Sequence, residues 1–223
     1  VIIETPVSNP PANIQLKNIN VVLSSIDAVV EADILWRGSQ HQYARPVAME
    51  LTPEEQEKWI TGMLEVPYVF INKYSFDTSE LLSDKVELNM EMVLPKYASR
   101  SGDRLFFNPN LIERRTSAPK ENSQRRSPVS LRYPYLDVDS VHYTIPADYQ
   151  IESIPTEVNL ETSFAEYTSK AVADGDSVII HVRKLEVKEY SVPAENYPEY
   201  RKFFSEVVKA DKNQIVLIRK NKN

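Results

Sequence analysis

The sequence predicts a mainly β fold, an antiparallel β-sandwich that also carries two helices of short to medium length. Three observations support this fold class. Segments in which apolar and polar residues alternate occupy most of the chain. Two of them meet across a turn that contains Asp174 and Gly175. Only two segments, at about 52–65 and 197–211, combine helix-capping signals with the apolar stripe of an amphipathic helix.

The chain opens with a proline-rich stretch that leads into a predicted hairpin. Residues 1–12 contain three prolines, which favour extended backbone, and we expect them to form a connector from a preceding domain of a longer protein. Two alternating runs within 13–37 are joined by the turn residues "SSID", which predicts an antiparallel hairpin. The apolar residues of the first run change phase once, so we expect a β-bulge between Leu16 and Ile19.

Both helices carry start signals. Thr52 is a good N-cap, Pro53 suits the first helical position, and Glu55 completes a capping box. The segment just before it, which includes His41, is expected to be a loop with at most a short helical turn. The second helix has a stripe of apolar residues with helical spacing: Tyr200, Phe203, Phe204, Val207 and Val208.

The remaining elements are predicted as strands. Residues 67–76, 85–95 and 104–112 form three of them, 129–146 and 149–155 form short ones, and 162–192 forms a long hairpin. The apolar run 215–218 is expected to lie inside a sheet, covered on both faces. The polar segment 113–128 is a loop. The β-sandwich of residues 13–223 is therefore either one domain or two halves, 13–112 and 129–223, divided by this loop.

Composition excludes several classes of function. The chain has 223 residues and no cysteine, so it contains no thiolate nucleophile, disulfide or thiolate metal site. Its net charge of -6 disfavours nucleic-acid binding, which requires a basic face. A mean hydropathy of -0.40, without a long uncharged apolar run, predicts no membrane-spanning helix. No motif in the sequence indicates a cofactor.

Histidine and acidic residues offer weak candidates for chemistry. Ser140 and His142 lie two residues apart on a predicted strand, roughly 7 Å from each other, which is too far for a nucleophile and its base. His181 is expected to be a half-exposed strand residue. No histidines have metal-ligand spacing. The pairs Asp137/Asp139 and Asp174/Asp176 lack the pattern of a calcium loop. We therefore expect no catalytic residue and no metal site.

Two groups of residues are candidates for ligand or partner contacts. The first is aromatic and could line a carbohydrate or peptide groove, although cross-strand packing explains tyrosines equally well. Its members are Trp36, Tyr43, Tyr133 and Tyr135. The second is the basic cluster of the 113–128 loop, which could contact an acidic partner or simply be solvated. Its members are Arg114, Arg115, Arg125 and Arg126, with Lys120 between them.

The C-terminal half resembles a known family. The phrases "YTIPADYQIESIP" and, after it, "FAEYTSKAVADGDSVIIHVRKLEVKEYSVPAENYPEYRKFFSEVVKADKNQIVLIRK" are similar to the C-terminal β-rich domain of unknown function that follows the transglutaminase-like core of exported Bacteroidetes proteins. The resemblance is clearest over residues 141–220. Its motifs are a proline-flanked strand pair, an Asp-Gly hairpin and a Tyr-Pro entry into the last helix.

The resemblance implies a role for the chain. The core of such proteins acts through a cysteine, and this chain has none, so no catalytic residue is carried over. The chain is expected to be a non-catalytic accessory domain that packs on the upstream transglutaminase-like core or shapes access to it, in the periplasm or outside the cell. The alternative is an independent carbohydrate- or peptide-binding module.

Overall fold

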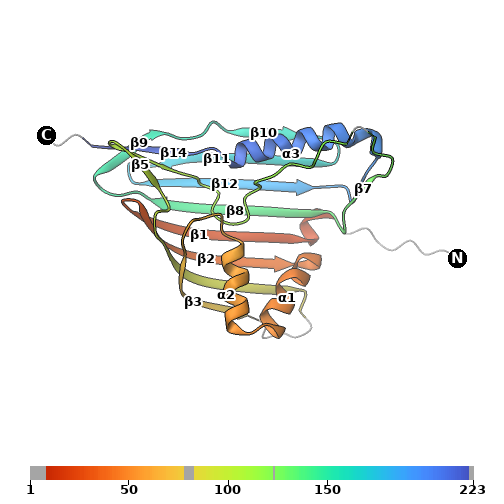
Figure 1. The fold of residues 1–223 in the computed structure, drawn as a ribbon, viewed down its shortest axis with the longest axis horizontal. Helices are drawn as coiled ribbons and strands as arrows, with labels where there is room; N and C mark the ends of the chain where they lie inside the picture. The colour runs from red at the N-terminus through yellow and green to blue at the C-terminus, as the bar shows by residue number, and fades with distance from the viewer. Residues whose placement is uncertain (1–8, 78–82, 123, 221–223) are drawn as a thin grey trace.

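The fold is built on one sheet of eight strands (Figure 1). The computed structural model describes residues 9–77, 83–122 and 124–220. The spatial order of the large sheet is β10-β11-β12-β8-β1-β2-β4-β3. Its strands are β1 (Ile14–Ser24), β2 (Asp27–Arg37), β3 (Phe70–Asp77), β4 (Lys85–Leu94), β8 (Tyr135–Thr144), β10 (Val158–Glu161), β11 (Ala165–Asp174) and β12 (Val178–Val187). Neighbouring strands are antiparallel except β1 and β8, which run parallel, so the sheet is mixed.

A smaller antiparallel sheet covers one corner of the large one. It has the order β5-β6-β14-β9, with β5 (Ser99–Ser101), β6 (Arg104–Phe107), β14 (Ile215–Arg219) and β9 (Tyr149–Ser153). Two short strands, β7 (Val129–Ser130) and β13 (Ser191–Val192), form a separate pair. Of the described residues, 47% lie in strands and 21% in helices, which confirms the mainly β prediction. The final strand lies inside its sheet, between β6 and β9, as predicted, although its second face is only half-buried.

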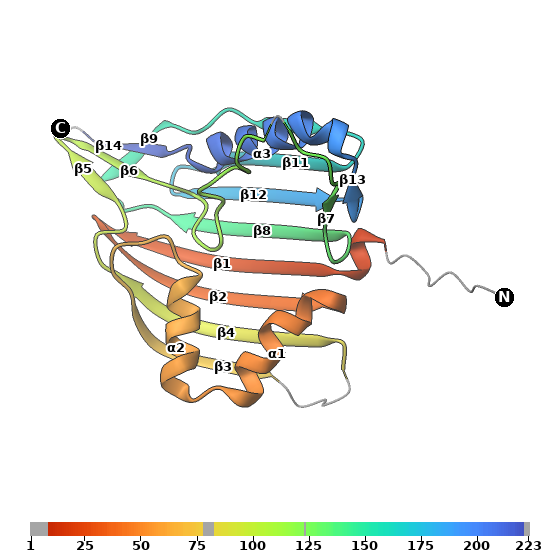
Figure 2. The same ribbon diagram turned by 45° about the vertical axis from the view of Figure 1, so that its right-hand side comes forward.

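All three α-helices lie on the same face of the large sheet (Figures 1 and 2). They are α1 (His41–Glu50), α2 (Pro53–Gly62) and α3 (Tyr197–Asp211). The predicted capping box is present at α2, because Thr52 and Glu55 each accept the other's backbone N–H. The apolar stripe of α3 is buried, as predicted. The expectation of a loop around His41 was wrong, because this residue begins the ten-residue helix α1.

The helix-covered, inner face contains two apolar cores. The larger core lies between strands β1 to β4, the helices α1 and α2, and the smaller sheet. The second core lies under α3, against β11 and β12. Between them the inner face of β1, β8 and β12 carries polar and charged side chains. These are Gln15, Lys17, Asp137, Asp139 and Arg183, and we call them the polar stripe.

The polar stripe explains an error in the sequence prediction. The β1–β2 register runs from Gln15 to Ser24 without a shift, so β1 has no bulge between Leu16 and Ile19. Gln15 and Lys17 therefore point to the same side as Ile19, and Leu16 points to the outer face. The bulge was expected because apolar side chains were assigned to the core and polar ones to solvent, and β1 reverses that assignment at its N-terminal end.

No helix or strand among the described residues covers the outer face of the large sheet (Figure 2). The cross-strand pair Val22 and Val29 lies there, and each residue is 49% exposed. Their row continues through Val93 on β4 to Phe70 on β3. An exposed apolar row, in which only Val93 is half-buried, thus crosses four strands at one end of this face.

Strands from the two predicted halves form two blocks of four that meet at the β8–β1 pair, with no break in the large sheet. β1 to β4 precede the 113–128 loop in the chain, β8 and β10 to β12 follow it, and the parallel pair β1–β8 joins the two sets. The loop has no helix or strand in its described residues, as predicted. No helix in the described part of the chain is long and apolar enough to cross a membrane.

Candidate functional site

A cavity of about 570 Å³ lies over the polar stripe, between the helix pair α1–α2 and the α3 side of the inner face. Its lining includes all four aromatic residues singled out in the sequence: Trp36, Tyr43, Tyr133 and Tyr135. Trp59 on α2 joins them, so both tryptophans of the chain line the cavity. The structure therefore gathers these residues at one place, and their contact with a ligand stays a prediction.

The floor of the cavity is set by strand register. Leu185, Asp137, Gln15 and Trp36 stand side by side on four neighbouring strands, because each is the cross-strand partner of the next. Residues two positions along a strand point to the same face. The next row of the floor therefore contains Arg183, Asp139 and Lys17, which are also mutual partners.

Buried ion pairs hold this second row in place. The Lys17 Nζ lies 2.8 Å from Asp139 Oδ1. Arg183 donates from Nη1 to Asp139 Oδ2 at 3.2 Å, and from Nε and Nη2 to the two oxygens of Asp211 at 2.9 and 3.1 Å. The Tyr167 hydroxyl donates to Asp211 Oδ1 at 2.6 Å. A buried charge is tolerated when it is paired and hydrogen-bonded in this way.

The electrostatics of the row follow from these pairs. Burial acts to lower the pKa of Lys17, but Asp139 and Glu113 outweigh it and raise that pKa. Burial acts to raise the pKa of Asp139, and Lys17 with Arg183 outweighs it and lowers that pKa. The carboxyl of Asp137 lacks so close a cation, and burial raises its pKa to about 6. Asp137 is thus the member of the polar stripe that changes charge near neutral pH.

Two glutamines orient the carboxylates that face the cavity. Gln15 donates from Nε2 to Glu113 Oε2 at 2.7 Å, and Gln40 donates from Nε2 to Asp137 Oδ1 at 2.8 Å. Gln40 Nε2 also contacts the Asn13 carbonyl at 3.1 Å. Each amide nitrogen therefore donates to a carboxylate or carbonyl, and no hydrogen bond among the described residues uses either amide oxygen.

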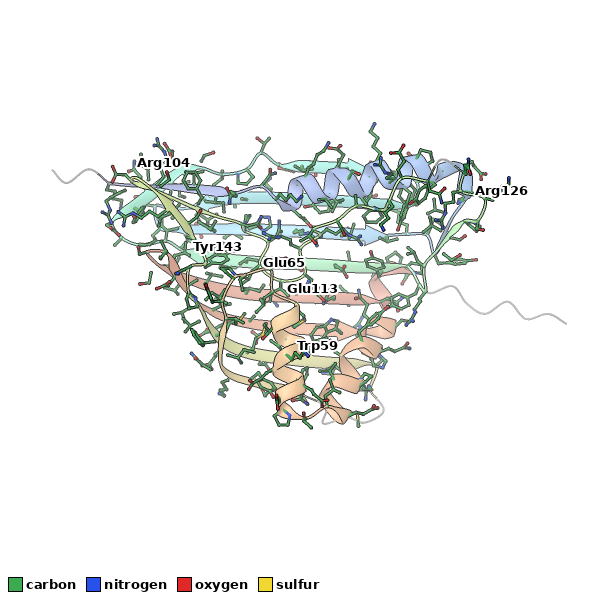
Figure 3. All side chains as sticks on the ribbon, in the orientation of Figure 1. Trp59, Glu65, Arg104, Glu113, Arg126 and Tyr143 are labelled. Carbon is green, nitrogen blue, oxygen red and sulfur yellow. The ribbon has the colours of Figure 1, made fainter. Side chains whose placement is uncertain are left out.

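Glu113 has an unusual backbone. Its φ of 54° lies in the left-handed region, which costs a non-glycine residue about 1 kcal/mol or more. Its N–H donates to the Met63 carbonyl at 2.8 Å, and Leu64 and Ile112 form a bridge beside it. These contacts hold Glu113 in front of the inner face of the sheet, near β1. In the view of Figure 3, Trp59 on α2 lies lower in the picture than Glu113.

Aromatic rings form the walls and the mouth. The ring centroids of Trp36 and Trp59 lie 5.8 Å apart, and the two ring planes are inclined to each other by 57°. Tyr43 on α1 is 51% exposed and lines the cavity together with Tyr133, which precedes β8. The mouth is thus spanned by residues from two segments about 90 positions apart in the chain.

The structure divides the predicted basic cluster. Arg115 lines the cavity, and its guanidinium stacks on Phe204 at 4.2 Å. Arg114 lines a separate hollow beside β6. Arg125 stacks on Tyr197 at 4.7 Å and donates to nearby backbone carbonyls. Arg126 is exposed at the β7 end of the molecule (Figure 3). Their role as partner contacts stays a prediction, and only Arg115 shares the cavity with the aromatic residues.

The histidines and acidic pairs lie elsewhere or have structural partners. Ser140 and His142 are on the outer face of the sheet, away from the cavity. The expectation for His181 was wrong: it is 1% exposed on the inner face, and its Nε2 contacts Ser169 Oγ at 3.1 Å. Within the described ranges no three His, Asp or Glu side chains are grouped closely enough to hold a metal ion.

Sequence reasoning missed most of the cavity lining. Among the residues it did not select are Gln15, Lys17, Gln40, Trp59, Glu113, Asp137 and Arg183. A signal for the floor was available, because Gln15 and Lys17 keep the inward phase of Ile19 once the bulge is abandoned. Arg183 likewise keeps the inward phase of Ile179. Nothing in the sequence places Glu113, a loop residue, over β1.

Comparisons with known proteins identify a family. A family model described as a domain of unknown function with a solved structure, DUF3858, matches residues 103–217, slightly more than half of the chain. No curated protein matches the chain. The chain is also similar to a solved structure from Parabacteroides distasonis ATCC 8503 described as a "putative protease", at 16% identity and a TM-score of 0.38. That match covers 44% of this chain and 19% of the other, so it spans about a fifth of that protein.

Proposed function

The chain belongs to the DUF3858 family, and from that premise we propose that it is a non-catalytic accessory domain that binds a carbohydrate or peptide in the cavity over its polar stripe. The observation that carries the proposal is the convergence of both tryptophans and three tyrosines on one cavity with a polar floor. Ligand sites are typically concave, with aromatic walls and a few placed polar groups.

The cavity suits a ligand that has both apolar faces and polar edges. Trp59 and Tyr43 offer ring surface, against which a sugar ring or a peptide side chain can stack, and Trp36, 3% exposed, packs against Trp59. Gln15 and Asp137 lie on the floor below and can hydrogen-bond the polar edge. The buried ion pairs beneath this floor keep its side chains in one arrangement before a ligand arrives, which lowers the entropy cost of binding.

The non-catalytic part of the proposal rests on chemistry. The chain has no cysteine, and Ser140 with His142 faces away from the cavity. The pair Ser169–His181 has suitable contact distance, but burial lowers the pKa of His181 to about 4, which makes it a weak base at neutral pH. The test is an assay of the purified chain with ester, amide and glycoside substrates. Turnover that is retained in a Ser169→Ala variant and lost in a cavity variant would refute this part of the proposal.

We further propose that the accessory domain serves an upstream transglutaminase-like core in an exported, periplasmic or extracellular protein of the Bacteroidetes. This rests on the resemblance over residues 141–220. The exposed apolar row of Val22, Val29, Val93 and Phe70 on the outer face is the surface we assign to that core. It leaves the cavity, on the opposite face, open to a ligand.

A pull-down with the preceding domain tests the contact. The double variant Val22→Lys/Val29→Lys should lose binding, because two charges would be placed in an apolar interface. Asn18→Lys, on the same face but outside the row, should bind as the parent does. Equal capture of all three proteins would contradict this surface.

Tryptophan fluorescence tests the ligand site directly, because the two tryptophans of the chain, Trp36 and Trp59, both line the cavity. Glycan and peptide libraries should yield ligands that shift this emission saturably. Tyr43→Ala should weaken them at least about tenfold, or about 1.4 kcal/mol, without unfolding the protein, since Tyr43 is half-exposed. Tyr68→Ala, an equally exposed tyrosine outside the cavity, is the control. Ligands that bind with no emission change and no response to Tyr43→Ala would place the site elsewhere.

A further inference from the structure

We propose that the cavity recognises its ligand through a primary ammonium group, held by the carboxylates of Glu113 and Asp137 among the aromatic rings. This inference rests on the proposed function and names the ligand chemistry of the same cavity.

Several polar atoms of the floor that take part in no hydrogen bond among the described residues are acceptors. Gln15 and Gln40 are only 5% and 8% exposed; Gln15 donates one N–H to Glu113, and Gln40 donates to Asp137 and to backbone carbonyls. Among the described residues, no hydrogen bond uses the Oε1 of either glutamine, the Oε1 of Glu113 or the Oδ2 of Asp137. Four oxygens on the cavity lining therefore lack a donor, and a ligand that donates several hydrogen bonds supplies it.

Three of the cations of the lining, Lys17, Arg183 and Arg115, already have partners within the protein. Lys17 and Arg183 are 2% and 4% exposed and are paired with the carboxylates of Asp139 and Asp211. The two positive and two negative charges of these four side chains cancel. The Arg115 guanidinium lies over the Phe204 ring, 4.2 Å from its centroid.

Arg132 completes the charged lining as an exposed side chain at the mouth. The two carboxylates nearest the empty volume are thus those of Glu113 and Asp137. Lys17 Nζ approaches Glu113 only at Oε2, at 3.3 Å, on the side where Gln15 also donates. The opposite oxygen, Oε1, remains for the ligand.

The aromatic walls favour the same ligand. Ring faces attract cations, and tryptophan attracts them most strongly. Trp36, Trp59, Tyr43, Tyr133 and Tyr135 line the same cavity as the two carboxylates, so a ligand held there meets both aromatic side chains and negative charge. Three N–H donors on one small cation match several converging acceptors better than isolated hydroxyl groups do.

Glu113 is held in its place at a conformational cost. Its left-handed φ of 54° is maintained by the bond from its N–H to Met63 and by the adjacent Leu64–Ile112 bridge. Such strain is frequent at ligand sites. It brings a loop carboxylate over a sheet whose own strands supply Asp137 and Gln15.

The experiment compares matched probes by tryptophan fluorescence. The peptide acetyl-Ala-Lys-Ala-amide should bind at least tenfold more tightly than acetyl-Ala-norleucine-Ala-amide, which has the same chain without the amine. Glucosamine and N-acetylglucosamine form a second pair, and this pair distinguishes an amino-sugar source from a peptide source. A preference for the amine in either pair supports the inference.

Charge-removing variants that keep the shape complete the test. Asp137→Asn and Glu113→Gln should each remove most of the tenfold preference, because each leaves an acceptor for its glutamine partner but no negative charge. Glu31→Gln, an exposed carboxylate on the outer face, should leave the preference unchanged. Folding of each variant is checked by circular dichroism and by the unperturbed emission spectrum.

The outcomes separate this inference from the proposed function. Neutral and amine probes that shift the emission equally, in the parent and in both variants, would overturn the ammonium inference and leave the cavity as a ligand site. Library ligands that bind without involving the cavity would overturn the proposed function itself. A preference that persists in both carboxylate variants would also overturn the inference, because no other free anion lines the described cavity.

Discussion

Replacing Asp211 by alanine should destabilise the protein more than any other single change at an ion pair in the described structure. Asp211 is 0% exposed, at the last position of α3, where a negative charge opposes the helix dipole. It is kept there by four donors: Arg183 Nε and Nη2, the Tyr167 hydroxyl and the Arg115 N–H. This residue thus joins α3, β11, β12 and the 113–128 loop.

The magnitude follows from what the substitution leaves behind. Arg183 would keep one partner, Asp139 at 3.2 Å, and would lose the bidentate pair. Removing one partner of a buried ion pair costs about 3–5 kcal/mol. The total stability of a domain is typically only about 5–15 kcal/mol, so the loss is a large part of it. Urea denaturation followed by circular dichroism and fluorescence at pH 7 measures the change in unfolding free energy.

A double variant makes the reasoning refutable even where the single one barely folds. Asp211→Ala/Arg183→Met removes both charges, and this double variant should be at least about 1 kcal/mol more stable than Asp211→Ala alone, because the buried cluster is left with one cation, Lys17, and one anion, Asp139, without excess charge. Glu206→Ala breaks an exposed pair with Lys209 on the same helix and should change stability by less than about 0.5 kcal/mol. A loss below about 1 kcal/mol for Asp211→Ala, or no recovery in the double variant, would refute the account.

Three further predictions concern the capping box and two titrating groups. Thr52→Ala should lower the unfolding free energy by about 1 kcal/mol in thermal melts, and exposed Thr61→Ala on the same helix should cost clearly less. Burial raises the pKa of Asp137 to about 6, above its unfolded value, so its contribution is favourable in acid and is lost as pH rises through 6. The free energy of unfolding of Asp137→Asn should therefore exceed that of the parent by up to about 2 kcal/mol at pH 8 and equal it at pH 3. No gain in stability at pH 8 would count against a raised pKa of Asp137. Burial lowers the pKa of His181 to about 4, so stability present above pH 6.5 is lost as pH falls toward 4. His181→Gln should remove up to about 3 kcal/mol of that acid loss, and an unchanged pH profile would contradict the assignment.

Periodicity predicted the elements well because most of them bury one regular face. The capping box at Thr52, the stripe of α3 and the Asp174–Gly175 turn are local signals, and each appears where the sequence indicates. The parallel pairing of β1 with β8 could not be read in the same way. Its partners are about 120 residues apart, and no turn links them. Local signals fix hairpins, whereas the order of distant strands depends on packing across the sheet.

The candidate site was only partly predictable for the same reason. The aromatic residues were noticed because large rings are conspicuous, and the structure brings all four of them to one cavity. The polar floor was missed because an inward-facing Lys17 or Arg183 contradicts the usual burial preferences. Such residues become plausible inside a protein only when their partners are known. Asp139 and Asp211 lie 122 and 28 residues away from them in the chain.

The position of the polar stripe links stability to binding. If β1, β8 and β12 carried only apolar side chains on the inner face, the two cores would merge over these strands and leave no room for a ligand. The ion pairs around Asp139 and Asp211 instead form a buried polar surface, and oxygen acceptors without a hydrogen-bond donor among the described residues lie beside these pairs. The charge on Asp137 is unfavourable for folding above pH 6 and is the charge on which ammonium recognition depends. A variant that gains stability at pH 8 while it loses the amine preference would show that both effects arise from the same carboxylate.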